Sequence, residues 1–268
     1  MDQLAKSDTA RKQEIRLIAL IGVPFVREGD DLCELIVQAL ARSGEQLLSG
    51  DVIVIAQKIV SKAQGRQVVL ESVIPSARAQ KLAAIVDKDP RLVELILSES
   101  SEVLRARKDV LIVVHRLGFV MANAGIDMSN VEANERDMRA LLLPTDPDGE
   151  CDKLRGAMLE RTGARVGVII NDSHGRAWRN GTVGVAIGAS GVSALRDLRG
   201  RPDLFGRELQ ITQVGLADEL AAAASLLMGQ ADEGIPVVIV RGMQIEGPAG
   251  HAADLIRPRE LDLFREPD

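Results

Sequence analysis

The sequence predicts an α+β fold in which helices cover mixed and antiparallel sheets. Short apolar runs typical of buried strands, at residues 52–56 and 166–170, are interspersed with amphipathic helical segments. Many strands follow one another at hairpin spacing, which is too close for the crossovers of a purely parallel sheet. The 268 residues are 46% hydrophobic, which is enough for a large core in one or two domains.

We expect residues 15–268 to form one domain, with a division into two lobes left open. Residues 1–14 are polar and predict a flexible leader. The sequence shows no internal repeat, low-complexity block or long linker.

In the first half of the chain, strands are expected where apolar runs end in glycine or proline, and helices where a cap precedes apolar residues at three-to-four spacing. The expected elements are a strand over 15–23, a helix over 31–40, a strand over 52–56, a helix or strand over 57–66, helices over 76–86 and 90–97, and strands over 110–114, 117–121 and 141–143.

The second half is centred on residues 166–181, VGVIINDSHGRAWRNG. The apolar run over 166–170 predicts a strand buried on both faces, and we expect it to stop at Asn171. A carboxylate, a hydroxyl, an imidazole and two guanidinium groups follow, and open sheets bind ligands beyond such strand ends. The other expected elements are a helix over 148–161, thin strands and turns over 182–193, a strand over 208–214, a helix over 216–228, a strand over 236–240 and a short helix near 251–256.

Composition excludes several classes of function. Lys and Arg total 33 against 39 Asp and Glu, so the net charge of −6 argues against bulk binding to nucleic acid or an anionic membrane. Aromatic residues make up only 2% of the chain, too few for a surface that stacks bases. Cys33 and Cys151 have no metal-site spacing, and no apolar run is long enough to span a bilayer. We therefore expect a cytoplasmic protein.

Two aspartates are candidate metal ligands. Asp127 and Asp172 each follow an apolar strand in a polar, glycine-bearing stretch, and carboxylate oxygens suit magnesium or manganese. An aspartate beside glycine is also an ordinary turn cap, and the sequence leaves that alternative open for each. The sequence alone does not show that the two converge.

Basic residues near these aspartates suit an anionic ligand. Lys58, Lys62 and Arg66 could meet phosphate oxygens or form a solvated face, and no P-loop sequence is present. Arg176 and Arg179 suit bidentate recognition of a substrate carboxylate or phosphate, with a salt-bridged loop as the alternative. The residues together indicate phosphoryl transfer from a nucleotide, or metal-assisted hydrolysis.

Seven motifs in fixed order then carry a resemblance over nearly the whole chain. They are GVPFVREGDDL (22–32), GDVIVIAQKIVSKAQGR (50–66), ANAGIDMSN (122–130), LLPTDPD (142–148), NDSHGRAWRNG (171–181), ADELAAAASLLMG (217–229) and RP-E-LDLFR (257–265). The chain resembles the coenzyme F420-0:L-glutamate ligase family, in its stand-alone form without a nitroreductase-like half.

The resemblance implies a GTP-dependent, GDP-forming amide ligase that joins L-glutamate to coenzyme F420-0, and adds further γ-linked glutamates to F420-1, through an acyl phosphate. It implies a two-lobed α+β homodimer. It implies a divalent metal, magnesium or manganese, with potassium as a further candidate ion. GTP contacts are implied for Val23, Pro24, Phe25, Val26, Gln57, Lys62 and Asn130, metal ligands for Asp127, Asp172 and Ser173, and catalytic roles for Asp127, Asp172 and Lys62.

Three positions depart from the residues common in that family. Ser173 stands where threonine is common, His174 where an apolar residue is common, and Gln57 where a small hydroxyl residue is frequent. These departures point to a retuned fit for nucleotide or substrate. Two rival functions stay open, a non-catalytic nucleotide- or deazaflavin-binding protein and a metal-dependent phosphohydrolase.

Overall fold

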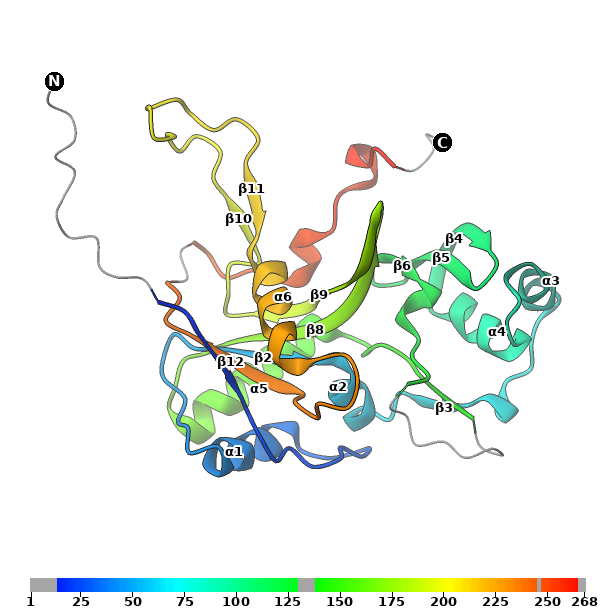
Figure 1. Cartoon of the computed structure of the whole chain (residues 1–268), viewed down its shortest axis with the longest axis horizontal. Helices are drawn as coiled ribbons and strands as arrows, with labels where there is room; N and C mark the ends of the chain where they lie inside the picture. The colour runs from blue at the N-terminus through cyan, green and yellow to red at the C-terminus, as the bar shows by residue number, and fades with distance from the viewer. Residues whose placement is uncertain (1–13, 130–137, 245–246, 265–268) are drawn as a thin grey trace, which may run out of the picture.

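The structure is a computed structural model that describes residues 14–129, 138–244 and 247–264 (Figure 1). A five-stranded sheet forms its larger lobe. In spatial order the strands are β1 (Arg16–Ala19), β12 (Val237–Arg241), β2 (Val52–Ala56), β8 (Gly167–Arg176) and β9 (Arg179–Ser190). β2 and β8 are parallel, whereas β1–β12, β12–β2 and β8–β9 are antiparallel. The expected mixed sheet is therefore present.

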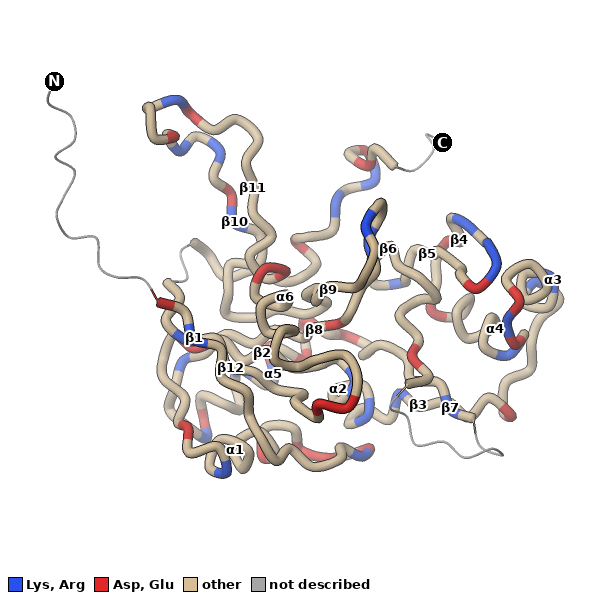
Figure 2. Tube along the Cα trace, in the orientation of Figure 1, with Lys and Arg blue, Asp and Glu red and all other residues tan. Residues whose placement is uncertain are grey.

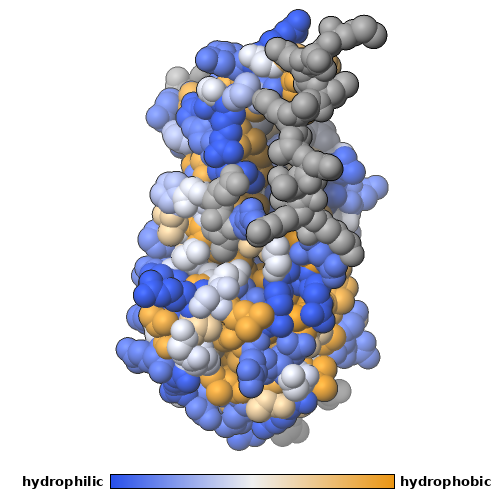
Figure 3. Space-filling model, turned by 90° about the vertical axis from the view of Figure 1, so that its left-hand side faces the viewer, coloured by the Kyte–Doolittle hydropathy of each residue, from blue (hydrophilic) through white to orange (hydrophobic). Residues whose placement is uncertain are grey.

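Helices cover both faces of this sheet, which explains why its central strands are continuously apolar. One face packs against α1 (Leu32–Arg42), α2 (Gln57–Ala63) and α5 (Pro147–Thr162), and the other against α6 (Leu216–Met228). In β2, Ile53 and Ile55 join the first core, while Val52 and Val54 join the second. Apolar patches alternate with polar residues on one side of the molecule (Figure 3).

The smaller lobe is built around a three-stranded antiparallel sheet. It contains β4 (Ser100–Arg107), β5 (Val110–His115) and β6 (Val120–Ala122), with α3 (Ala77–Val86) and α4 (Pro90–Ser98) packed against it. A ladder between β3 (Gln67–Val69) and β7 (Arg139–Leu141) runs beside a separate small core. The chain is thus an α+β protein, as the sequence predicts, and its described elements form two lobes.

Short elements complete the described chain. A two-stranded arm, β10 (Leu195–Asp197) and β11 (Gln213–Gly215), extends from the larger lobe (Figure 1). Four 3-10 turns are η1 (Leu70–Ser72), η2 (Asn123–Gly125), η3 (Ala252–Leu255) and η4 (Arg259–Leu261).

The main correction concerns the stretch after residue 170. We expected the strand to stop at Asn171, but β8 continues to Arg176 and pairs with β9 along its whole length. The outer part of this hairpin extends beyond the sheet core, so polar side chains remain partly exposed there while the backbone ladder continues. The change from apolar to polar residues at Asn171 therefore marks where side-chain burial ends, whereas the strand continues beyond it.

The remaining differences are smaller. Residues 57–63 are helical, and the strand expected over 117–121 begins only at Val120, after a turn. The strand expected over 208–214 is confined to Gln213–Gly215. β4 was not predicted, because two register shifts against β5 interrupt its alternation. Residues 1–13 of the expected leader lie outside the described chain.

Candidate functional site

The parallel pair β2–β8 places two chain segments at one edge of the sheet. Ala56, the last residue of β2, pairs with Asn171 of β8. The next residues are Gln57, which begins α2, and Asp172. Because parallel strands end at the same edge, the start of α2 lies level with Asp172.

Asp127 reaches the same helix from the smaller lobe. Its Oδ2 atom lies 2.6 Å from Nζ of Lys58, the second residue of α2. Its backbone exchanges two hydrogen bonds with Leu141, which fix its position, and its Oδ1 atom accepts from the backbone N–H and hydroxyl of Ser129. Burial opposes ionisation of Asp127, but Lys58 and Ser129 outweigh it and hold the pKa of this carboxyl below its usual range. Asp127 is therefore an ionised, half-buried carboxylate.

Asp172 lies on the α2 face of the sheet. Its neighbour Asn171 donates to Ser225 of α6 on the other face, so alternation turns Asp172 away from α6. The Oδ2 atom of Asp172 lies 3.0 Å from Nε2 of His174, and the His174 ring meets Phe119 edge-on at a centroid distance of 6.3 Å. Both aspartates therefore lie near the first turn of α2, one from each lobe.

Ser173 has a different orientation. It pairs with Gly184 in the β8–β9 ladder and is exposed. Because successive strand residues point to opposite faces, its side chain leaves the sheet on the side of α6, opposite to that of Asp172.

Gln57 carries an unpartnered polar group. The residue is 2% exposed, and its Oε1 atom accepts from the Ser61 hydroxyl at 2.9 Å. Within the described chain its buried Nε2 atom has no hydrogen-bond partner. An unpaired buried amide is costly, which marks Gln57 as a position that lacks a partner within the described chain.

The turn over residues 23–26 lies between β1 and α1. Phe25 is 88% exposed, whereas Val26 is buried in the core. The backbone N–H of Gly29 donates to the carbonyl of Ala63, which ties this loop to the end of α2. Lys62 occupies the last turn of the same helix and is partly buried. The segments expected to contact a nucleotide therefore lie along α2.

The two arginines predicted to bind substrate stand apart from the residues around α2, and Asn130 lies outside the described chain. Arg176 and Arg179 are exposed at the tip of the β8–β9 hairpin, where Arg176 donates to the carbonyl of Gly181. Figure 2 shows positive charge at this tip. Asn130 belongs to residues 130–137, which the structure does not describe.

Lys58 and Ser129 are the main additions to the predicted site. The sequence places Lys58 in a lysine cluster, but it does not show that this lysine is the partner of Asp127. Ser129 could have been anticipated, because a serine two residues after an aspartate can close a local side-chain turn. The pairing across 69 positions between Lys58 and Asp127 has no comparable local signal, since it depends on how the two lobes meet.

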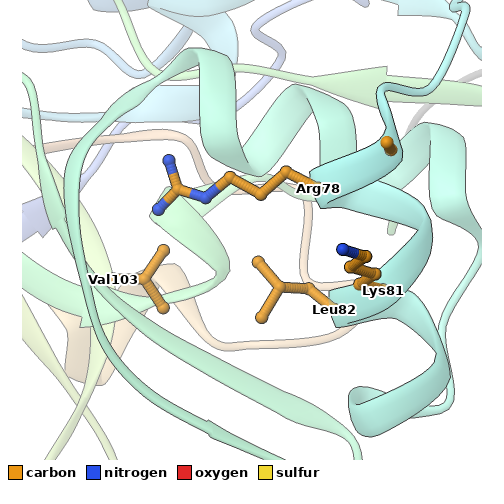
Figure 4. Close-up of a pocket in the computed structure, with 5 residues that line it drawn as sticks. Arg78, Lys81, Leu82 and Val103 are labelled. Carbon is orange, nitrogen blue, oxygen red and sulfur yellow. The ribbon is translucent and has the colours of Figure 1, made fainter.

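A cavity in the smaller lobe lies apart from the residues predicted for this chemistry. A cavity of about 390 Å³ lies between α3 and β4 in the smaller lobe, lined by Ala77, Arg78, Lys81, Leu82 and Val103 (Figure 4). None of the residues predicted for the site lines it. Cys33 and Cys151 are buried thiols with burial as the main cause of their raised pKa values, so neither is an activated nucleophile. Every helix of the described residues is too short or too polar to span a bilayer.

Comparison with known proteins identifies the family. Residues 21–242 match the family described as F420-0:Gamma-glutamyl ligase. The chain belongs to this family. It is 51% identical over 257 residues to the coenzyme F420:L-glutamate ligase of Methanothermobacter thermautotrophicus, which covers 94% of this chain and 99% of the relative.

Two further relatives agree. The protein of the same name from Archaeoglobus fulgidus is 46% identical, over 94% of this chain and 96% of its own. That of Methanocaldococcus jannaschii is 44% identical, over 94% of this chain and 99% of its own. This member of the F420-0:gamma-glutamyl ligase family is therefore a ligase, and the resemblance inferred from the seven motifs is confirmed.

Proposed function

We propose that this ligase joins L-glutamate to coenzyme F420-0 by an amide bond, with GTP as the phosphoryl donor, and that it can extend F420-1 by a further γ-linked glutamate. The names of the relatives support the acceptor and the amino acid. The observation that carries the proposal is the arrangement around α2, where Asp127 and Asp172 approach from different lobes beside Lys58 and the unpaired amide of Gln57.

In this proposal the nucleotide lies along α2. The turn formed by Val23, Pro24, Phe25 and Val26 would contact GTP at one end, and Gln57 and Lys62 along the helix. The amide of Gln57 supports this assignment because it is buried without a protein partner. Asn130 stays a proposed GTP contact on the resemblance alone.

The donor set suits a magnesium or manganese ion. The described residues contain no cluster of three or more His, Cys, Asp or Glu side chains of the kind that holds a metal alone. Magnesium, however, is usually bound by one or two carboxylates together with substrate phosphates and water. Asp127 and Asp172 would supply those carboxylates, with potassium as a further candidate ion. The resemblance assigns Ser173 as a third ligand, but the place of its side chain on the other face of β8 does not support that role. A divalent cation would neutralise charge on the β- and γ-phosphates.

The reaction follows from the weakness of a carboxylate as an acyl donor. A carboxylate oxygen of the deazaflavin side chain would attack the γ-phosphorus of GTP, and the bond to the β-phosphate oxygen would break to release GDP. The amine of glutamate would then attack the acyl carbon, lose a proton and expel phosphate. Lys62 would stabilise the transferring phosphoryl group, and Arg176 or Arg179 would hold a substrate carboxylate or phosphate.

A homodimer is part of the proposal. The resemblance implies it, and the β10–β11 arm supports it, because Leu204 and Phe205 near its tip are 99% and 90% exposed. Light scattering of the purified chain would test the dimer, and a mass equal to one chain at micromolar concentration would exclude it.

The decisive experiment combines purified protein with coenzyme F420-0, GTP and L-glutamate. We expect GDP release that depends on glutamate, and a product heavier by one glutamyl residue in mass spectrometry. Phosphate release without an amine acceptor would favour a phosphohydrolase. Tight GTP binding without any product would favour a non-catalytic binding protein.

A further inference from the structure

The C-terminal segment, residues 247–264, is not used by the proposed site, although its RP-E-LDLFR motif is part of the family resemblance. Its first part is fixed to the larger lobe. Asp148 in the first turn of α5 accepts from the backbone N–H groups of Ala252 and Ala253, and His251 Nε2 lies 3.2 Å from Asp152. This end of the segment is therefore anchored beside α5.

The segment then contacts the smaller lobe. The side chain of Ile256 packs against Gly118 in the β5–β6 turn, where a Cβ atom on Gly118 would meet Ile256 at 2.9 Å. Arg259 donates to Glu102 of β4 at 3.0 Å. The segment thus contacts both lobes, and in Figure 1 it rises beside the β8–β9 hairpin.

Its last described residues meet the tip of the β8–β9 hairpin. The ring of Phe264 lies 5.0 Å from that of Trp178, with the planes tilted by 52°. Both side chains are exposed, Trp178 by 82% and Phe264 by 71%, so their contact is a surface contact that can open without breaking the core. Trp178 has a positive φ of 58° and lies between Arg176 and Arg179.

These contacts close a ring of three segments. The β5–β6 turn contacts the hairpin through Phe119 and His174, and the C-terminal segment contacts both the turn and the hairpin. The connections named here between the hairpin tip and the smaller lobe are made by side chains. The ring therefore links the hairpin to the smaller lobe through side chains.

We propose that residues 251–264 form a strap that holds the hairpin tip beside the smaller lobe and opens to admit or release the acidic substrate. Phe264 and Arg259 are positioning residues in this arrangement. They act through Trp178 and Glu102, and they place Arg176 and Arg179 for the substrate anion. The functional half of this inference rests on the proposed ligase activity, whereas docking of the strap does not.

The chain offers a direct probe of docking, because Trp178 is its only tryptophan. Removing the Phe264 ring should expose the indole further to water. We expect Phe264→Ala to shift the emission of Trp178 to longer wavelength and to increase its quenching by acrylamide. Leu263 is the matched control, since it is adjacent and 82% exposed, and Leu263→Ala should leave the emission unchanged. Unchanged emission and quenching in Phe264→Ala would overturn the strap.

The second measurement is steady-state kinetics with full-length variants. Loss of one aromatic contact should raise KM for coenzyme F420-0 about two- to tenfold, with kcat and KM for GTP little changed. Phe264→Tyr should restore the wild-type value. Arg259→Glu should also raise KM for coenzyme F420-0. The double variant Arg259→Glu with Glu102→Arg should recover the wild-type KM, which would not happen if each residue acted only locally.

The outcomes separate the two proposals. Altered Trp178 emission with an unchanged KM for the acid substrate would overturn the positioning role. A wild-type enzyme without ligase turnover would overturn the proposed function alone, because the emission experiment still decides whether the strap docks.

Discussion

Lys58 Nζ lies 2.6 Å from Oδ2 of Asp127, across the boundary between the two lobes. Both side chains are about one-quarter exposed, so the pair is screened less than a surface salt bridge. The lysine occupies a carboxylate oxygen that a bound cation would need. Lys58 is therefore both the partner that keeps Asp127 ionised and a competitor for any metal at that carboxylate.

We expect Lys58→Met to bind Mn²⁺ more tightly than the wild type when no nucleotide is present, by about three- to tenfold. The reason is that the cation no longer displaces an ammonium group from Asp127. Titration followed by electron paramagnetic resonance would measure the free Mn²⁺. Lys58→Arg keeps the positive charge and serves as the control. Equal affinity in Lys58→Met and the wild type would show that Lys58 and the metal do not share Asp127.

Removing either proposed metal carboxylate should stop catalysis without unfolding the protein. We expect Asp127→Asn and Asp172→Asn each to lower turnover by roughly a hundredfold or more, because each removes charge that offsets phosphate charge in the transition state. Asp232→Asn, at an exposed loop position, is the control and should be active. Thermal melts should remain close to that of the wild type. A large loss of melting temperature in Asp127→Asn would instead mark this residue as a structural turn residue.

Much of the fold is predictable from local sequence, since buried strands and capped helices depend on their own residues. Residues 52–56 and 216–228 have the predicted bounds, because a continuous apolar run or a glycine stop defines each end. The hairpin beyond Asn171 was missed for a physical reason. Its ladder is formed by backbone groups, which carry no side-chain signal once the strand leaves the core.

The site is predictable in part. Asp127 and Asp172 each follow an apolar strand, and their carboxylates indicate ligand chemistry, whereas Gln57 is implied only by the family resemblance. Their meeting near α2 depends on β2 and β8 being parallel neighbours and on the smaller lobe reaching Lys58. Neither relationship is encoded over a few residues, so the sequence alone names the candidates and leaves their convergence undecided.

Gly184 lies where β9 packs closely against α6, and this close contact leaves no room for a larger side chain. A Cβ atom at this position would lie 2.3 Å from Ser225 Oγ and 2.5 Å from the carbonyl oxygen of Ala221. The backbone of α6 cannot move locally to avoid it, so Gly184→Ala should reduce the free energy of unfolding by about 1–3 kcal/mol. Urea denaturation would measure this change.

The matched substitution is Gly156→Ala, in the exposed middle of α5. A Cβ atom there would meet nothing within 4 Å, and alanine favours the helix, so we expect a gain of about 0.5–1 kcal/mol. If both variants shifted the urea midpoint in the same direction, the close approach of β9 and α6 would not be limiting.

Glu99 carries a pH-dependent share of the stability. It is 8% exposed at the end of α4. Its Oε2 atom lies 2.9 Å from Nη2 of Arg66, 3.0 Å from Nε of Arg116 and 3.5 Å from Nε2 of His115. Burial alone would raise the pKa of Glu99, but His115, Arg116 and Arg66 outweigh burial and lower it from 4.5 to about 2.

Because the pKa of Glu99 is lower in the folded state, its contribution is complete above pH 4.5 and is lost as the pH falls from 4.5 towards 2. We expect Glu99→Gln to reduce the free energy of unfolding at pH 7 by about 3 kcal/mol, since the variant leaves the two guanidinium groups without their carboxylate. The difference in the free energy of unfolding between Glu99→Gln and the wild type should become smaller as the pH falls from 4.5 to 3. Urea denaturation of both proteins at pH 7, 5 and 3 would measure it. A difference that stays constant over this range would mean that Glu99 stabilises the fold through packing, because a packing contribution does not titrate.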